Sequence, residues 1–511
     1  MKKSSSFSGS LGFVLAAAGS AVGVGNIWRF PYLCAKDGGG LFLLVYLVLV
    51  LTFGFTLLTT DVAIGRRTKQ NALNAFATLN KKWKFLGYLT FLVPTLIMTY
   101  YSVIGGWITK YFTLYLVSSG DAAAQDGFFT SFITSPVSPI VFMLIFLALT
   151  AWVVYCGVEK GIEKYSRYIM PGLLLLIIGI AIFSLTLSYT DESGMTRTGI
   201  EGLLVYIKPD FTGLTVQRFL NIALDAMSQL FFSLSVSMGI MITYGSYTGK
   251  EVNLVRSTAM ICIFDTLVAL IAGLAIFPSV AHFDPALLGS SKGVALMFII
   301  LPQVFESMGG VGQVVSFAFF VMVDIAAITS VVSLIEVVTQ FVIQKFHAHR
   351  KRAALIVAGV CFLVSIPIGI SLGHVAILEE ASPALFGLDW LTFFDEMTNT
   401  VLMPVCALFS CIVVGWFITP RRAVAEIEAE GTPMSGWLKK VYAVMIRFVT
   451  PALILIVEIG GLQSEIAAGN VAVIVFAYAL VALCVAAYFI FFRNTDTGTN
   501  ADEKLSGDYP V

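Results

Sequence analysis

Small and polar residues interrupt two long apolar segments of this 511-residue chain. The interruptions read SAVGVGN at 20–26 and SLSVSMG at 233–239. A helix broken in this way leaves backbone carbonyls free to coordinate a cation, and its N-terminal ends can face an anionic group. A carboxylate at Asp265 and adjacent hydroxyls at Thr329 and Ser330 stand in other apolar segments. These residue types predict a site for a hard cation, which prefers oxygen ligands.

Each feature also has a simpler interpretation. Gly19 and Gly23 form a GxxxG spacing, which is typical of close helix packing, although packing leaves Asn26 unexplained. The hydroxyl of Thr329, like that of its neighbour, can bond back to its own helix. Asp265 can be a protonated, hydrogen-bonded core residue.

The composition places these segments in a membrane. Hydrophobic residues make up 58% of the chain and charged residues 12%, against about 45–50% and 25% in soluble domains. A helix needs about 20 apolar residues to cross a bilayer, and twelve segments are long enough. They are 10–34, 40–65, 88–117, 139–156, 167–188, 215–247, 255–281, 312–345, 353–373, 391–418, 440–461 and 470–492. An all-α integral membrane protein follows.

The loops indicate how these segments are oriented. Lys and Arg gather in loops such as 66–69, 81–84 and 350–352, which predicts that these loops and both termini are cytoplasmic. We expect a multi-pass protein of the inner (plasma) membrane. The loop at 282–311 is expected to form a surface helical hairpin, and the polar tail at 493–511 is expected to be disordered.

The two interrupted segments are the first and the sixth, so they cross the bilayer in opposite directions. This offset is typical of inverted repeats. We predict one transporter domain over 1–511, with repeats at about 10–188 and 215–418 and two appended helices at about 440–492.

Several other classes of protein are disfavoured. The net charge of zero argues against a nucleic-acid partner. The seven cysteines form no CxxC, and no HExxH or Walker motif indicates an enzyme. A channel needs a continuous polar lining, whereas the polar residues here gather at one depth.

Longer stretches resemble the neurotransmitter:sodium symporter family over essentially the whole chain. They include GSAVGVGNIWRFPYLCAKDGGGLFLLVYL at 19–47, YYSVIGGW at 100–107, QLFFSLSVSMGIMITYGSY at 229–247 and DEMTNTVLMP at 395–404. The resemblance implies the LeuT fold, a 5+5 inverted repeat with helices 1 and 6 unwound at mid-membrane.

The resemblance also implies two sodium sites. The first maps onto the Ala21 carbonyl with Asn26, Ser233 and Asp265, and the carboxylate of the substrate completes it. The second maps onto the carbonyls of Gly19, Val22 and Ala326 with the hydroxyls of Thr329 and Ser330.

Asp265 departs from the family pattern. The bacterial leucine transporter has asparagine there and glutamate four residues later, where chloride-dependent relatives have serine. This chain has Ala269 at the later position. Asp265 is therefore expected to supply the negative charge, which predicts transport without chloride. Since an aspartate can titrate, a proton-coupled carrier is an alternative.

The substrate pocket that the resemblance implies is mostly apolar. In monoamine carriers an aspartate at the position of Gly23 pairs with the amine; glycine here predicts an α-amino acid, which brings its own carboxylate to Tyr101. A hydrophobic or aromatic side chain fits the rest. The expected pocket residues are Ser20, Ala21, Gly23, Gly25, Ile97, Tyr101, Phe232, Ser233, Ser235, Met238, Ser330, Ser333 and Leu334.

The resemblance also implies an outer gate and an inner gate. Arg29 and Asp395 match the outer ion pair, with Gln229 nearby. The inner gate is expected to use Tyr247, Ser246 and Glu336. Its usual arginine and acid are replaced by Ser4 and Gln344, and Lys2 or Lys3 is a candidate partner for Glu336.

The sequence thus predicts a sodium-coupled importer of a hydrophobic or aromatic L-amino acid that works by alternating access. Its partners would be the amino acid and the lipid bilayer, as a monomer or a homodimer. A sodium-linked amino acid sensor of the same fold, which binds without turnover, is the alternative from another class.

Overall fold

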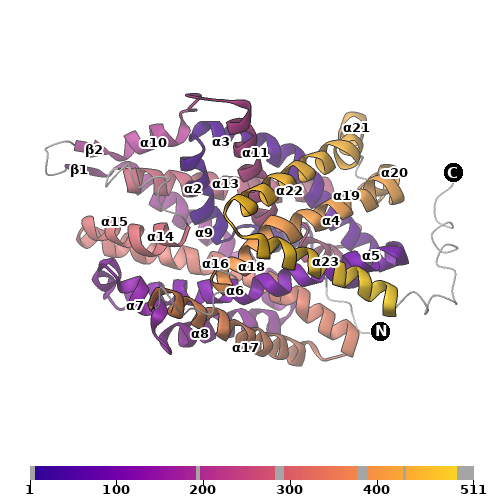
Figure 1. Ribbon diagram of the computed structural model, residues 1–511, viewed down its shortest axis with the longest axis horizontal. Helices are drawn as coiled ribbons and strands as arrows, with labels where there is room; N and C mark the ends of the chain where they lie inside the picture. Colours follow the sequence, from indigo (N-terminus) through magenta and orange to yellow (C-terminus); the bar gives the residue numbers. More distant parts are fainter. Residues whose placement is uncertain (1–5, 191–195, 282–292, 378–387, 430–432, 492–511) are drawn as a thin grey trace.

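A computed structural model describes residues 6–190, 196–281, 293–377, 388–429 and 433–491. The positions 2–4 and the tail at 493–511, for which we made predictions, lie outside these ranges. The described chain is almost entirely helical (Figure 1), with one short antiparallel ribbon of β1 (Ser188–Thr190) and β2 (Thr196–Thr198).

Within the described residues, ten helices are long and apolar enough to cross a membrane, and a bent pair can count as an eleventh. The bent pair joins Ser10–Ala21 to Gly25–Lys36 at an angle of 57°. The ten are Gly40–Thr68 (α3, η2, α4), Lys81–Leu116 (η3, α6), Ser138–Cys156 (α8), Val158–Leu185 (η5, α9), Leu254–Val280 (within α13, Leu254–Ala281), Gly310–Phe346 (α16), Arg350–Ser371 (within α17, Arg350–Ile377), Trp390–Ile418 (α18, η8, α19, η9), Gly436–Ala467 (α21, η10, α22) and Val471–Ile490 (within α23, Val471–Phe491).

The sixth of our twelve expected segments, 215–247, is divided. It forms α11 (Val216–Ser233) and α12 (Ile240–Ser246), separated by six non-helical residues. α12 has only seven residues, and α11 carries Arg218 and Asp225 among its apolar residues. Neither helix alone is long and apolar enough to count as a span, which is why the structure shows up to eleven rather than twelve.

Short elements connect the spans at the two ends of the molecule. They are α5 (Ala72–Leu79), η4 (Gly120–Ala124), α7 (Phe128–Thr134), α10 (Gly199–Ile207), α14 (Gly293–Ala295), η7 (Leu296–Ile300), α15 (Leu301–Ser307) and α20 (Pro420–Ile427). Figure 1 shows α5 and α20 at one end and the β ribbon, α7 and α15 at the other. The described part of the expected hairpin at 282–311 is the helical run α14, η7 and α15.

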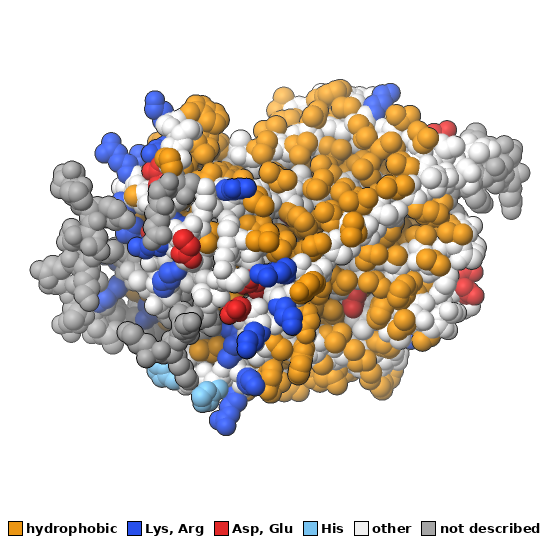
Figure 2. Space-filling model, turned by 180° about the vertical axis from the view of Figure 1, so that it is seen from behind, with side chains coloured by type: hydrophobic (Ala, Val, Ile, Leu, Met, Phe, Trp, Pro, Cys, Tyr) orange, Lys and Arg blue, Asp and Glu red, His pale blue; other side chains and the backbone are white. Residues whose placement is uncertain are grey.

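Burial divides the spans into central and peripheral ones. The most apolar window of α6 is 78% buried, as is that of α16, whereas that of α23 is 11% buried. Figure 2 shows hydrophobic side chains over a broad band of the surface, with Lys and Arg concentrated towards the end where α5 and α20 lie. The site must therefore lie near α6 and α16, while α23 presents its apolar side chains to lipid.

Two carboxylates, those of Asp37 and Asp225, lie near each other at the end of the molecule opposite α5 and α20. Asp37 follows α2 (Phe30–Lys36) and is 6% exposed. Burial and, to a smaller extent, the nearby carboxylate of Asp225 raise the pKa of Asp37 to about 7, against the opposing effect of Lys36. Lys36 itself forms an ion pair with Asp225. The folded protein thus binds a proton at Asp37 at pH values where the unfolded chain does not.

Replacing Asp37 with asparagine tests whether the buried charge of Asp37 destabilises the folded protein. A carboxyl whose pKa is raised on folding destabilises the protein above that pKa, and protonation relieves the cost as the pH falls towards the unfolded value. We expect Asp37→Asn to raise the melting temperature by about 1–3 °C at pH 8.5, and the gain to shrink between pH 7.5 and 5. The exposed Asp121 supplies the control variant Asp121→Asn. A gain that is equal at pH 5 and 8.5 contradicts the assignment.

Candidate functional site

The first span breaks after Ala21. α1 (Ser10–Ala21) ends there and η1 (Gly25–Arg29) begins after three residues. Val22 is extended, with ψ of 103°. The backbone N–H of Val24 donates to the hydroxyl of Tyr101 on α6 at 3.0 Å. The break therefore turns main-chain groups toward α6, where they find side-chain partners instead of helical ones.

The sixth span breaks between Ser233 and Ile240. Ser235 and Ser237 have φ of 51° and 64°, a left-handed conformation that is costly for residues other than glycine. The N–H of Ser237 donates to the carboxylate of Asp61 at 2.8 Å, and Asp61 is 1% exposed. Asp61 was not among the residues expected at the site, although an acid inside the expected span 40–65 is a signal of function.

Three serine hydroxyls join the two breaks to α16. Ser20 Oγ donates toward Ser333 Oγ at 2.8 Å and toward Ser235 Oγ at 3.2 Å. Ser235 Oγ in turn donates to the Ser20 carbonyl at 3.1 Å. Both interruptions and the centre of α16 therefore meet at one depth.

A cavity lies at this meeting point. Eleven of the thirteen residues expected in the substrate pocket line it, and Gly25 and Ser233 are the two that do not. Asn26 and Ile240 also line it. The rings of Tyr101 and Phe232 lie 6.1 Å apart on its wall. None of the described residues that line the cavity carries a charge, so the charges of a zwitterion would have to be met by backbone dipoles, hydroxyls and a bound ion.

Behind the cavity, the residues of the first expected sodium site are in direct contact. Asn26 Nδ2 donates to Asp265 Oδ1 at 2.8 Å and toward Ser233 Oγ at 3.1 Å. Ser233 Oγ donates to both carboxylate oxygens of Asp265, at 2.7 and 2.8 Å. Ala21 is the last residue of α1 and lines the cavity beside them. This set of buried oxygens suits a hard cation, which would replace the amide N–H at the carboxylate after Asn26 turns its oxygen inward.

Residues of the second expected sodium site lie where α1 passes α16. Ser330 Oγ approaches the Val22 carbonyl at 3.4 Å. Thr329 Oγ1 donates to the carbonyls of Ile325 and Ala326, both at 3.1 Å. Thr329 is therefore bonded back to its own helix in this conformation. Gly19 lies one turn before Val22 on α1.

Gly23 has no room for a side chain. A Cβ on Gly23 would lie 2.8 Å from Ser330 Oγ and 3.1 Å from the Tyr101 hydroxyl. On Gly25 a Cβ would lie 2.9 Å from the ring of Phe232. Glycine at position 23 thus leaves space for the hydroxyls of Ser330 and Tyr101 at the cavity. The side chain of an aspartate at this position would not fit.

The expected outer ion pair is not formed in this structure. Arg29 Nη2 donates to Ser228 Oγ at 2.8 Å rather than to Asp395. Asp395 accepts from Asn399 Nδ2 at 2.6 Å, and Gln229 Nε2 donates to the Gly25 carbonyl at 3.1 Å. The sequence identifies positions that can pair but not the conformation in which they do so.

The inner gate differs from our expectation in its partners. Glu336 is fully buried and accepts from the Tyr247 hydroxyl at 2.6 Å and from Gln340 at 3.1 Å. Its cationic partner is Arg350, at the start of α17. Our expectation of Lys2 or Lys3 falls outside the described residues, and Arg350 takes the place we gave them. The basic run HRKR at 349–352 was the signal.

Further contacts hold the N-terminal segment against this gate. The Phe7 N–H donates to the Tyr247 carbonyl at 3.2 Å, and its ring meets that of Tyr247 at 5.9 Å. The Ser8 N–H donates to Glu163 at 2.8 Å. Ser246, by contrast, bonds back to the Thr243 carbonyl and takes no part in the Glu336 network. The inner side is thus closed by several contacts, whereas the outer pair is open.

Comparison with known proteins identifies the family. The model of the sodium:neurotransmitter symporter family matches residues 4–120 and 131–492. The chain belongs to this family. It is 36% identical to the uncharacterized sodium-dependent transporter YhdH of Bacillus subtilis, over 88% of this chain and 95% of that protein. A sodium-dependent transporter of Haemophilus influenzae is 30% identical over 90% and 99%.

A solved structure confirms the fold. The crystal structure of MhsT in complex with L-phenylalanine has a TM-score of 0.78 and 35% identity, and the match covers 90% of this chain and all of MhsT. Human sodium- and chloride-dependent GABA transporter 2 is 25% identical over 81% of this chain and 73% of that protein. This sodium:neurotransmitter symporter is therefore a multi-pass, sodium-dependent transporter of a small molecule with the LeuT fold, and it is not an enzyme.

Gly23→Ala tests the space at the break. The added methyl must displace Ser330 Oγ or the Tyr101 hydroxyl, so we expect at least a tenfold loss of substrate affinity, about 1.4 kcal/mol. Gly179 has no neighbour within 4 Å of an added Cβ; Gly179→Ala is the matched control and should bind as the unmodified protein does. Unchanged affinity in Gly23→Ala would show that the break has more room than the structure gives it.

Arg350→Gln tests the inner gate. It leaves the buried Glu336 without a cation, and breaking such a pair costs about 3–5 kcal/mol. We expect faster hydrogen exchange in α1, measured by mass spectrometry, because the inner side opens more often. Arg352→Gln, at an exposed position two residues away, should have no effect.

A double variant separates the charge from a general loss of packing. Glu336→Gln together with Arg350→Gln removes both charges, so exchange in α1 should return toward the unmodified rate. Exchange that stays as fast as in Arg350→Gln alone argues that the guanidinium closes the gate through its contact with the Val154 carbonyl.

Proposed function

We propose that this transporter imports a hydrophobic or aromatic L-amino acid, coupled to two sodium ions and independent of chloride. The observation that carries the proposal is the uncharged cavity between two broken helices, with the carboxylate of Asp265 directly behind it. An amino acid needs one cation for its carboxylate and carbonyl dipoles for its ammonium group. A sodium ion held at Asp265 and the backbone carbonyls of the breaks would meet both needs.

The shape of the cavity supports the substrate class. Tyr101 and Gly23 are among the residues that give it polar groups. Ile97, Phe232, Met238 and Leu334 give it an apolar lining that suits a hydrophobic or aromatic side chain. MhsT, a similar structure, was crystallised with L-phenylalanine.

Asp265 supports chloride independence. A buried cation beside a carboxylate is already neutralised. The GABA transporter relative is chloride-dependent by name, which in this family corresponds to a site that lacks such a fixed charge. Here the fixed carboxylate makes a second anion unnecessary.

Two sodium ions provide enough energy for accumulation. Each charge that crosses 100 mV yields about 2.3 kcal/mol, so two yield about 4.6 kcal/mol for a zwitterionic substrate. At about 1.4 kcal/mol per decade, this supports roughly a thousandfold gradient before the sodium gradient is counted. Import in this direction agrees with an inner-membrane location in which the Lys- and Arg-rich end faces the cytoplasm.

Uptake into proteoliposomes tests the proposal. Purified protein would be given each of twenty labelled L-amino acids with an inward sodium gradient, with potassium in place of sodium, and with gluconate in place of chloride. We expect sodium-dependent accumulation of a few apolar or aromatic amino acids, unchanged without chloride. Asp265→Asn should lower the apparent sodium affinity at least tenfold, because it removes the charge that holds the ion.

Other outcomes point to the alternatives. Sodium-dependent binding without accumulation or counterflow indicates a sensor. Accumulation driven by a pH gradient without sodium indicates proton coupling through Asp265. Loss of uptake in gluconate overturns chloride independence alone.

A further inference from the structure

A groove lies at the end of the molecule that carries α5 and α20. It lies between the last turns of α4 (Phe55–Thr68) and η9 (Val413–Ile418), beneath α20. Its walls are apolar, formed by Ile64, Leu79, Val414 and Ile418. At its base the hydroxyls of Thr60 and Tyr442 share a hydrogen bond of 2.9 Å, so no polar group there calls for a partner from outside.

The rim of this α4–η9 groove has a charge imbalance. Arg67 and Arg422 both line it, half-buried and exposed respectively. Neither forms an ion pair or a side-chain hydrogen bond with any part of the chain that the structure describes. The groove contains one acid, Glu426, and that acid is already neutralised.

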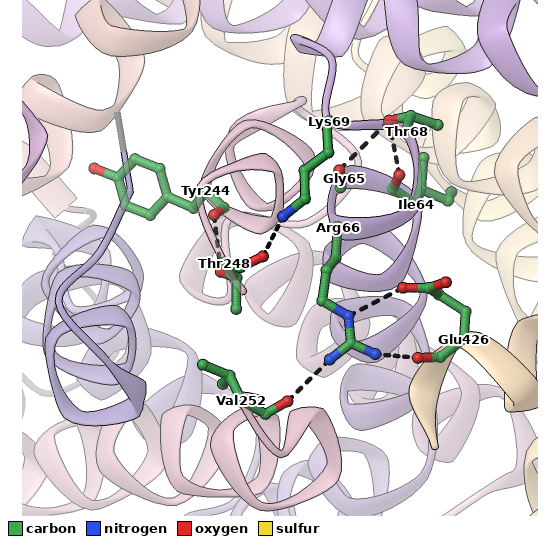
Figure 3. A network of polar contacts seen from close by, with 9 residues as sticks. All are labelled: Ile64, Gly65, Arg66, Thr68, Lys69, Tyr244, Thr248, Val252 and Glu426. Atoms are coloured by element: carbon green, nitrogen blue, oxygen red, sulfur yellow. Dashed lines mark hydrogen bonds and ion pairs between the residues drawn. The ribbon is translucent and has the colours of Figure 1, made fainter. Parts of the chain in front are cut away.

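Figure 3 shows how Glu426 is neutralised. Arg66 is fully buried, and its Nε donates to the Glu426 carboxylate at 3.0 Å. Its Nη1 donates to the Val252 carbonyl at 2.9 Å, and its Nη2 bonds the backbone carbonyl of Glu426. Lys69 is likewise bonded to the Thr248 carbonyl. Arg66 thus neutralises the acid, and two guanidinium groups at the rim remain uncompensated.

Aromatic residues place the groove at the level of lipid headgroups. Trp416 and Trp437 are 56% and 72% exposed, and Trp416 packs against the exposed Phe448. Exposed tryptophan is typical of the membrane–water interface. The groove therefore has apolar walls at the depth of the upper acyl chain and two cations at the depth of the phosphate.

We propose that the α4–η9 groove binds one phospholipid with an anionic headgroup from the leaflet on this side of the membrane. Arg67 and Arg422 bind its phosphate, for which the planar guanidinium is well matched, and the apolar walls accept the start of an acyl chain. The bound lipid bridges α20 to α4, next to the Arg66 contact that already joins them.

Native mass spectrometry of the full-length protein tests this site. The protein would be titrated with dioleoyl phosphatidylglycerol or dioleoyl phosphatidylcholine. We expect at least a tenfold preference for the first lipid, lost in Arg67→Gln/Arg422→Gln. The matched control is Arg421→Gln/Lys440→Gln, which removes two exposed charges outside the groove lining and should keep the preference.

A second variant and a soluble anion complete the test. Ile418→Trp fills the groove and keeps both arginines, so it should lower phosphatidylglycerol binding. Inorganic phosphate at 10 mM should leave the melting temperature unchanged, whereas phosphatidylglycerol should raise it. The proposal is overturned if the rim variant binds like the unmodified protein, if the control loses the preference equally, or if phosphate alone gives the full stabilisation.

Discussion

The requirement that every buried backbone group find a partner governs this structure. A helix satisfies its own backbone, so breaking two helices at membrane depth exposes groups that lipid cannot satisfy. The protein satisfies them with side chains from neighbouring spans: Tyr101 accepts the N–H of Val24, and Asp61 accepts that of Ser237. Tyr101 also lines the cavity, so at the first break the group that makes unwinding tolerable is part of the candidate site.

The same requirement explains the two kinds of polar contact at the breaks. Contacts around Asp265 join three side chains within 3.1 Å and are completely buried. A low dielectric makes such a cluster stable only while all of its members are paired. In the proposed sodium site, the ion would take the place of the Asn26 amide at the Asp265 carboxylate, which would tie ion binding to the geometry of the first break.

Much of the fold and of the candidate site could be predicted from the sequence, because the residues that form each feature lie close together along the chain. The breaks, the acid at Asp265 and the hydroxyls of α16 are each visible in a few residues, and the family resemblance supplied their grouping. The predictions that did not agree with the structure depended on contacts between loops far apart in the sequence or on the conformation of the protein. Arg350 could not be assigned to Glu336 from the sequence. The two residues lie on different helices and come into contact only because the chain turns between α16 and α17. The division of repeats at 10–188 and 215–418 stays a prediction.

The two faces of the protein differ in how firmly they are closed, and this difference has a physical origin. The inner side combines a buried ion pair at Glu336, the ring of Phe7 against Tyr247, and the Arg66 contacts to Glu426 and Val252. On the outer side, Arg29 bonds only to a serine. An exposed ion pair stabilises a protein by about 0–1 kcal/mol, whereas breaking a buried ion pair costs about 3–5 kcal/mol. Opening the side closed by Glu336 and Arg350 therefore requires a compensating gain, and under the proposed function a substrate in the cavity would provide it, because residues of both α1 and α16 line that cavity.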